Sequence, residues 1–206
     1  MNELNIAFIG AGNMASSIIG GLLNQGMPAA NLCASDPHAE TLQRLGETYG
    51  VRTSTDNASA VATANVVILA VKPQIMPAVT QALAPSLQQH KPVVISIAAG
   101  ITVNALQQQL GATTAIIRCM PNTPALIQCG ATAMYANEHT STTQKNHAET
   151  ILGAVGDAHW VSDESMLDAV TALSGSGPAY FFLFMEAMTA AGASMGLQPE
   201  LSRALT

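Results

Sequence analysis

Short apolar runs alternate with helix-like stretches along most of the chain. Two of the runs, at residues 65–71 and 93–98, are apolar almost throughout and rich in β-branched residues. A continuous run of this kind is typical of a central parallel strand that is buried on both faces. Between the runs, apolar residues recur at helical spacing. The pattern therefore predicts strands and helices in alternation.

The expected elements can be placed by residue range. Strands are expected at residues 4–9, 31–35, 51–54, 65–71, 93–98, 114–119, 131–135 and 159–161. Helices are expected at residues 14–25, 38–49, 57–63, 75–83, 102–110 and 142–154, with Thr102 as the cap of the fifth. This alternation predicts an α/β fold, a doubly wound parallel (Rossmann-type) sheet with right-handed crossovers over residues 1–162.

After residue 162 the pattern becomes helical only. Residues 162–165, read as SDES, form a helix-start signal, and SGSGP at residues 174–178 is expected to interrupt that helix. A long helix is expected from Pro178 to about Gly196, because proline is tolerated in a first helical turn. A last helix is expected to begin at Glu200. Residues 163–206 are thus predicted to begin a second, all-helical domain.

The helix expected at residues 178–196 is apolar on nearly every face. Its large apolar residues are Phe181, Phe182, Leu183, Phe184, Met185, Met188 and Met195. A helix of this kind must be buried on most sides. A membrane span is the alternative, but Glu186 lies in its middle and no lysine or arginine flanks either end closely. The sequence favours a helix buried between copies of a soluble protein.

Composition narrows the range of functions. Apolar residues make up 49% of the chain and charged residues 10%, a low charge density that indicates a surface covered by a partner subunit. The net charge is −6 without a basic cluster, which argues against nucleic-acid binding. The three cysteines (Cys33, Cys119 and Cys129) are scattered and odd in number, so we expect reduced thiols in the cytoplasm and no zinc site.

The first strand ends in a glycine turn with the spacing Gly10-x-Gly12-x-x-Ala15. This is the dinucleotide fingerprint. Gly10 permits the sharp turn, Gly12 lets a pyrophosphate approach the backbone, and Ala15 lets the helix pack near the strand. The N–H groups at the helix start would then face the phosphates. An ordinary tight turn is the alternative interpretation.

Other strands also end in unusual loops. They are AVKP at residues 70–73, SIAAG at 96–100 and MPNTP at 120–124. Ligands bind beyond the carboxyl ends of strands in such sheets, so Lys72 is placed near phosphate or ribose. Asn122 and Thr123 offer hydrogen bonds suited to a carboxamide. A solvated lysine and a proline-bracketed turn are the respective alternatives.

No histidine lies in a nucleophilic motif or at metal-ligand spacing, so no metal is expected and no catalytic residue stands out. A hydride-transfer enzyme needs neither, because the cofactor supplies the reacting atom.

Five stretches taken together resemble the pyrroline-5-carboxylate reductase family. They read FIGAGNMA (8–15), ILAVKPQ (68–74), SIAAGIT (96–102), IRCMPNTPALI (117–127) and DAVTALSGSGPAYFF (168–182), in the family's order. The resemblance implies reduction of the imine Δ1-pyrroline-5-carboxylate to L-proline with NADH or NADPH. It also implies a dimer, or a larger ring of dimers, built by the C-terminal helices.

The resemblance and the loops together give a candidate site. The cofactor residues are expected to be Ile9, Gly10, Ala11, Gly12, Asn13, Met14, Ser35, Asp36, Asn57, Ala70, Val71, Lys72, Pro73, Ala98, Ala99, Gly100 and Asn122. A partial substrate set is expected to be Met120, Asn122, Thr123, Ser176 and Gly177.

Two features depart from the family pattern. The family continues beyond Thr206 with further dimer helices and a Ser-Pro-Gly-Gly-Thr-Thr segment for the substrate, so we expect a truncation here and little or no turnover by these residues alone. At the ribose, Asp36 suits the 2′-hydroxyl of NAD, and Pro37 stands where many NADP-using relatives have arginine. Ser35 could still bond a phosphate, so the NAD or NADP preference stays open.

Other functions remain as alternatives. A β-hydroxyacid dehydrogenase would need a lysine and an asparagine where this chain has Phe181 and Phe184. Another imine reductase is the second alternative. The third is a nucleotide-binding or assembly fragment without turnover.

Overall fold

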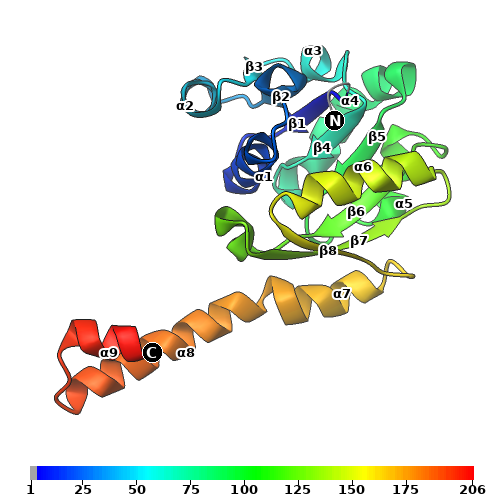
Figure 1. The fold of residues 1–206 in the computed structure, drawn as a ribbon. Helices are drawn as coiled ribbons and strands as arrows, with labels where there is room; N and C mark the ends of the chain where they lie inside the picture. Colours follow the sequence, from blue (N-terminus) through cyan, green and yellow to red (C-terminus); the bar gives the residue numbers. More distant parts are fainter. Residues whose placement is uncertain (1–3) are drawn as a thin grey trace.

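The computed structural model describes residues 4–206 and shows a layered α/β unit followed by a helical arm (Figure 1). The strands are β1 (Ile6–Ile9), β2 (Leu32–Ser35), β3 (Arg52–Ser54), β4 (Val66–Leu69), β5 (Val93–Ser96), β6 (Ile116–Met120), β7 (Gly130–Ala136) and β8 (Gly156–Trp160). The α-helices are α1 (Asn13–Asn24), α2 (Ala39–Tyr49), α3 (Asn57–Val61), α4 (Met76–His90), α5 (Val103–Leu110), α6 (Thr142–Gly153), α7 (Met166–Val170), α8 (Gly177–Ser194) and α9 (Pro199–Leu205). Short helices of other types are η1 (Ala29–Asn31), η2 (Pro73–Ile75), η3 (Thr123–Ile127) and η4 (Thr171–Gly175).

The strands form one sheet in the order β3-β2-β1-β4-β5-β6-β7-β8. The first six, from β3 to β6, pair in parallel, in the order of a doubly wound dinucleotide-binding sheet. The expected Rossmann-type fold is therefore confirmed. Most expected elements lie within a few residues of the observed ones.

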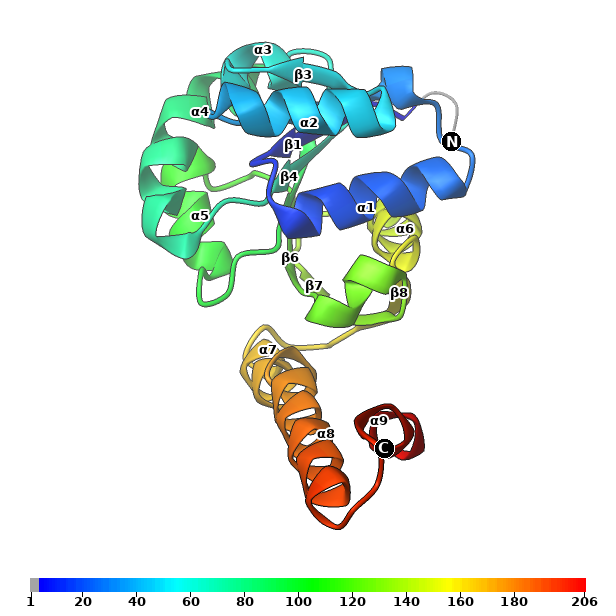
Figure 2. The ribbon, with the colours of Figure 1, turned by 90° about the vertical axis from the view of Figure 1, so that its left-hand side faces the viewer.

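Helices cover both faces of the sheet, and each face has its own hydrophobic core (Figure 2). Along β1, Ile6 and Phe8 pack with α1, α2 and α6, whereas Ala7 and Ile9 pack with α3, α4 and α5. Successive side chains of a strand point to opposite faces, so a strand that is covered on both must be apolar at every position. This is why the central runs read as continuously hydrophobic.

The expectation of a parallel sheet is wrong at one strand. β7 pairs antiparallel with β6, with Cys119 opposite Met134, and β8 then pairs in parallel with β7 through α6. The connection between β6 and β7, residues 121–129, contains only the short helix η3. A parallel return needs a crossover of about a dozen residues or more, so this connection allows only the antiparallel pairing.

Helix α4 is longer than expected, because it continues through Pro85 to His90 rather than ending near Leu83. Leu83 and Leu87 on either side of the proline are both buried in the same core, and this packing holds the helix together across it. The helix ends at His90 and is followed by the C-cap residue Lys91, whose backbone is left-handed with φ 51°.

The helical arm leaves the sheet at α7 and extends away from it through α8 and α9 (Figure 1). The SGSGP stretch does not open a loop between α7 and α8. It forms part of a π-helical turn, η4, in which the Ser176 N–H donates to the Thr171 carbonyl at 2.8 Å. The first helix therefore runs almost directly into the second.

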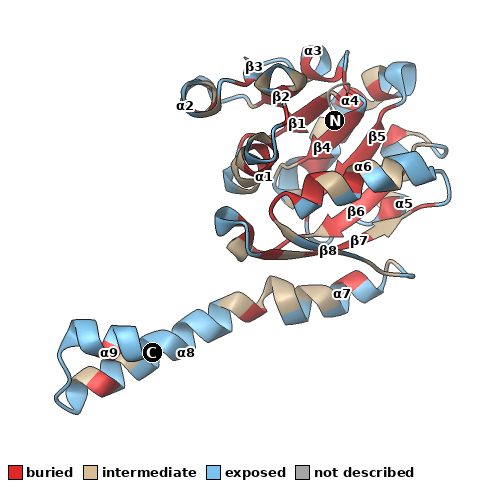
Figure 3. Ribbon diagram, in the orientation of Figure 1, coloured by how far each residue is buried: buried red, intermediate tan, exposed pale blue. Residues whose placement is uncertain are grey.

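The large side chains of α8 are exposed in this single chain (Figure 3). Phe181 is 70% exposed, and the buried residues of α8 are Gly177 and Gly192. α9 folds back on α8, where the Ser202 hydroxyl donates to the Thr189 carbonyl at 2.7 Å. Within residues 4–206, no helix combines the length and apolar character that a membrane crossing requires.

Candidate functional site

The glycine turn lies where the sheet order reverses direction, between β1 and β4. The turn is tied to both neighbouring strands, because Gly10 N–H donates to Ser35 at 2.7 Å and Ala70 N–H donates to Ile9 at 2.8 Å. Helices α1 and α4 leave this point on opposite faces of the sheet. In open α/β sheets the usual ligand site, here called the crevice, is the region at this point outside the carboxyl ends of the strands.

The fold places different demands on the two glycines of the turn. Gly10 has φ +99°, and a Cβ added to it would lie 2.7 Å from the Ala70 carbonyl oxygen, so the fold itself requires glycine. Gly12 has φ −74° and ψ −175°, which any residue adopts, and a Cβ there would meet no atom within 4 Å. Nothing inside the chain requires Gly12 to lack a side chain, and the space above it is open to a bound group.

The amino end of α1 is prepared for an anion. The helix begins at Asn13 after Gly12, and no side chain caps its first turn. Ala15 is fully buried against the sheet, which fixes the helix close to the strand. Uncapped N–H groups and the positive end of the helix dipole together favour a phosphate at this position.

The acidic residue after β2 is directed at the glycine turn. Asp36 accepts hydrogen bonds from the Ala11 N–H and the His38 N–H, both at 3.0 Å, and pairs with the His38 ring at 2.9 Å. Partial burial raises the pKa of Asp36, but these hydrogen bonds outweigh it and hold the pKa below its ordinary value. Asp36 is therefore ionised and fixed at the edge of the crevice.

Two further expected cofactor residues, Ser35 and Asn57, are joined to each other near Asp36. The Ser35 hydroxyl donates to the Asn57 side-chain oxygen at 2.7 Å, and both residues belong to elements next to β1. The structure thus brings Ser35, Asp36 and Asn57 close to the glycine turn, but Ser35 is fully buried and its hydroxyl is used by Asn57, which argues against the expected bond from Ser35 to a phosphate. Contact of Asp36 and Asn57 with a cofactor stays a prediction.

A cavity of about 270 Å³ opens next to the crevice, at the ends of β4, β5 and β6. Its lining residues are Met14, Ala70, Val71, Lys72, Pro73, Ile97, Ala98, Ala99, Met120 and Pro121. The lining is mostly apolar with one cation. Lys72 is exposed and belongs to none of the ion pairs found within residues 4–206. Gly100 and Thr123, both exposed, follow in the adjoining loops.

The side chain of Asn122 is used within the chain. Asn122 is 8% exposed, its Oδ1 accepts from the Ala131 N–H at 2.9 Å, and its Nδ2 donates to the Ser174 carbonyl at 3.1 Å. It therefore links the loop after β6 to the π-helical turn, next to Ser176 and Gly177. Whether it also contacts a ligand stays a prediction.

The sequence analysis missed a buried ion pair beside the site. Arg118 of β6 is 6% exposed, and its guanidinium lies 2.9 Å from Glu164 and 3.8 Å from Asp168. Glu164 also accepts from the Val103 N–H at 2.8 Å, at the start of α5. A charged residue in the middle of an apolar strand was the available signal, because a buried charge needs a partner.

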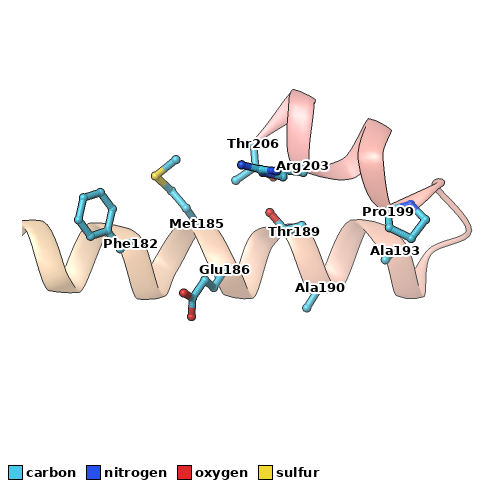
Figure 4. Close-up of a pocket in the computed structure, with 9 residues that line it drawn as sticks. All are labelled: Phe182, Met185, Glu186, Thr189, Ala190, Ala193, Pro199, Arg203 and Thr206. Atoms are coloured by element: carbon cyan, nitrogen blue, oxygen red, sulfur yellow. The ribbon is translucent and has the colours of Figure 1, made fainter. Parts of the chain in front are cut away.

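A second pocket, of about 570 Å³, lies between α8 and α9, away from the glycine turn (Figure 4). Its lining residues are Phe182, Met185, Glu186, Thr189, Ala190, Ala193, Pro199, Arg203 and Thr206. Figure 4 shows Glu186 pointing away from α9, and the rest of the lining is mainly apolar. This pocket belongs to the exposed surface of the arm.

Residues 4–206 were also compared with the requirements of a metal site and of a nucleophilic cysteine. Within residues 4–206, no cluster of three or more histidine, cysteine, aspartate or glutamate residues could hold a metal ion. Burial raises the pKa of the Cys119 thiol, which keeps it protonated and a poor nucleophile. Cys33 and Cys129 are also free thiols.

Comparison with known proteins gives consistent matches. Residues 164–206 match the family model described as pyrroline-5-carboxylate reductase dimerisation, and residues 5–100 match that described as NADP oxidoreductase coenzyme F420-dependent. A pyrroline-5-carboxylate reductase of Pseudomonas aeruginosa is 53% identical over all of this chain and 75% of its own length.

Solved structures agree with these matches. A pyrroline-5-carboxylate reductase from Coxiella burnetii has a TM-score of 0.94 and 43% identity, over 99% of this chain and 76% of its own. The Plasmodium falciparum pyrroline carboxylate reductase with NADP bound has a TM-score of 0.88 and 30% identity, over 100% of this chain and 75% of its own.

Proposed function

Since the chain belongs to the pyrroline-5-carboxylate reductase family, we propose that the crevice beside β1 holds a nicotinamide dinucleotide. We propose further that this dinucleotide and the substrate meet in the adjoining cavity. The protein is an NAD(P)H-dependent oxidoreductase of proline biosynthesis, and its substrate is the imine Δ1-pyrroline-5-carboxylate. When bound, the dinucleotide would supply a hydride to the imine carbon, and the imine nitrogen takes up a proton, so that the C=N bond becomes the ring amine of L-proline.

The open space above Gly12 is the observation that carries the proposal. The open space there and the uncapped start of α1 suit a pyrophosphate, with the N–H groups of Gly12, Asn13 and Met14 as donors. Ile9, Gly10 and Ala11 set the shape of this turn.

The two ends of the dinucleotide take different neighbours. Asp36 and Asn57 would face the adenosine ribose, where the ionised Asp36 favours a hydroxyl over a phosphate, whereas Ser35 is fully buried and would act through its hydrogen bond to Asn57. Residues 70–73 and 98–100 would line the other half, and the exposed Lys72 would supply a positive charge near phosphate or ribose.

The substrate would lie at the far side of the cavity, toward Met120, Thr123, Ser176 and Gly177. The lining of the cavity is mainly apolar. We place the boundary between the dinucleotide-binding unit and the helical unit at residues 162 and 163. The match to a dimerisation family supports self-association of the helical unit.

The proposal also covers the cellular location of the protein and whether it binds nucleic acid. We place it in the cytoplasm, since its three cysteines are free, as in a reducing compartment. A net charge of −6 supports a protein that does not bind nucleic acid.

The test combines binding with turnover. NADH and NADPH are titrated against the chain by calorimetry, and oxidation of each is then followed with pyrroline-5-carboxylate present. Turnover is measured on this chain and on one extended to the length of its relatives. We expect binding by the chain, and turnover that needs both the imine and the extended chain. Absence of binding to either cofactor would refute the proposed site.

A further inference from the structure

A proline creates a hydrogen-bonding problem at the junction between the two units. In a continuous helix the Ser174 carbonyl would accept from the N–H four residues later, but that residue is Pro178, which has none. The next N–H, of Ala179, donates to Ser176 at 3.1 Å instead. The carbonyl of Ser174 therefore needs a donor from outside the helix.

Asn122 supplies that donor from the dinucleotide-binding unit. Its Nδ2 donates to the Ser174 carbonyl at 3.1 Å while its Oδ1 accepts from the Ala131 N–H at 2.9 Å. One partner is a donor and the other an acceptor, so only one orientation of the amide satisfies both. The side chain is 8% exposed, and water therefore competes poorly for either bond.

The same junction touches the cavity through a second contact. A Cβ on Gly175 would lie 2.7 Å from the terminal carbon of Met120, so the π-helical turn packs directly on this side chain. Met120 in turn lines the cavity that adjoins the glycine turn. The place where the arm is attached is therefore also one wall of that cavity.

We propose that Asn122 is a positioning residue, which fixes the start of α8 against the cavity by replacing the hydrogen bond that Pro178 cannot donate. The proposal rests on the proposed function in one respect, namely that the part of the molecule positioned by Asn122 is the substrate side of the site. Asn122 acts through Ser174 and η4, and the bond itself is a property of the fold.

The bond can be isolated because a backbone N–H can be restored at residue 178. Pro178→Ala gives the Ser174 carbonyl a donor within the helix and makes the Asn122 amide dispensable there. Asn122→Ala, Pro178→Ala and the double variant form a cycle, measured by thermal unfolding. Loss of the Ala131 bond is common to both backgrounds and cancels in the cycle.

We expect Asn122→Ala to lower the unfolding midpoint by about 2–10 °C when Pro178 is present, because the partly buried Ser174 carbonyl loses its partner. With alanine at position 178, the further drop should be half of that or less. Pro199→Ala is the matched control, since Pro199 occupies the first turn of α9 and its helix makes no bond to Asn122. That variant should leave the effect of Asn122→Ala unchanged.

Cofactor binding and turnover separate positioning from direct contact. If Asn122 positions α8, Asn122→Ala lowers kcat/KM for pyrroline-5-carboxylate in the extended chain at least fivefold, with the Kd for NADPH changed less than twofold. Pro178→Ala then recovers most of the loss.

Equal losses of kcat/KM in both backgrounds would mean that the bond to Ser174 does not account for the loss, and would overturn the proposal. The proposal would also be overturned if the effects of Asn122→Ala and Pro178→Ala on the unfolding midpoint simply add. Failure to bind NADPH or to reduce the imine would count against the proposed function alone, because the unfolding cycle needs no ligand.

Discussion

Replacing Gly12 tests the cofactor site without disturbing the fold. The backbone at Gly12 is extended, and an added Cβ would meet no atom of the chain within 4 Å. Gly12→Ala should therefore leave the unfolding midpoint unchanged or raise it, since alanine restricts the unfolded chain and stabilises by about 0.4–1 kcal/mol at compatible sites. The same methyl group would occupy the space where a pyrophosphate approaches the helix.

Gly12→Asp adds charge to the steric effect. A carboxylate about 4 Å from one phosphate charge, at an effective dielectric constant of about 20, costs about 4 kcal/mol. A loss of this size is about a thousandfold in Kd. We therefore expect weak or no binding of NADH and NADPH to Gly12→Asp.

Calorimetric titration and thermal unfolding are measured together, with two controls. Gly10→Ala should bind poorly because it unfolds more easily, since the left-handed backbone alone costs about 1–2 kcal/mol. Gly153→Ala, at the end of α6 and equally open, should change neither binding nor the fold's integrity. Unchanged affinity of Gly12→Asp for both cofactors would refute the argument.

Four further results are expected. Asp36→Ser should shift the affinity ratio toward NADPH, about 5- to 150-fold if the removed repulsion is about 1–3 kcal/mol; an unchanged ratio would place the ribose elsewhere. The pKa of Asp36 lies below its ordinary value, so its stabilisation is complete above that ordinary value and is lost as the pH falls through the lowered one. Acid unfolding below about pH 4 should hence be less steep in Asp36→Asn. Glu164→Ala leaves Arg118 buried and poorly paired and should cost about 3 kcal/mol in chemical denaturation, the low end for buried pairs because Asp168 remains. The chain should self-associate in light scattering at micromolar concentration, and Phe181→Glu should weaken this; a stable monomer that binds no hydrophobic dye would contradict it.

The local features of the site could be predicted from sequence because each depends on neighbouring residues. The glycine turn, the strand before it and the cap at Thr102 all follow from short-range stereochemistry, and Thr102 does accept from the Ala105 N–H at 3.2 Å. The direction of β7 was also within reach, since the length of its connection to β6 decides it. The alternation of the preceding elements outweighed that signal.

The links between the two units could not be predicted in the same way. Asn122 and Ser174, or Arg118 and Glu164, lie far apart in the sequence, and no local pattern pairs them. The SGSGP stretch was misleading for a related reason. Its glycines and proline favour a break, but the π-helical turn and the amide of Asn122 meet the backbone's needs without one.

The exposed arm divides the molecule into parts that open independently. The sheet buries its apolar strands on both faces within one chain, so its amides should exchange only in global unfolding. α8 has almost no buried side chains of its own in the single chain, and the described links between the arm and the sheet lie before it, at η4 and at the ion pairs of Arg118 with Glu164 and Asp168. Dilution should therefore release hydrogen-exchange protection in α8 and α9 long before it affects β1 to β6. The order of the arm, unlike that of the sheet, becomes a function of protein concentration.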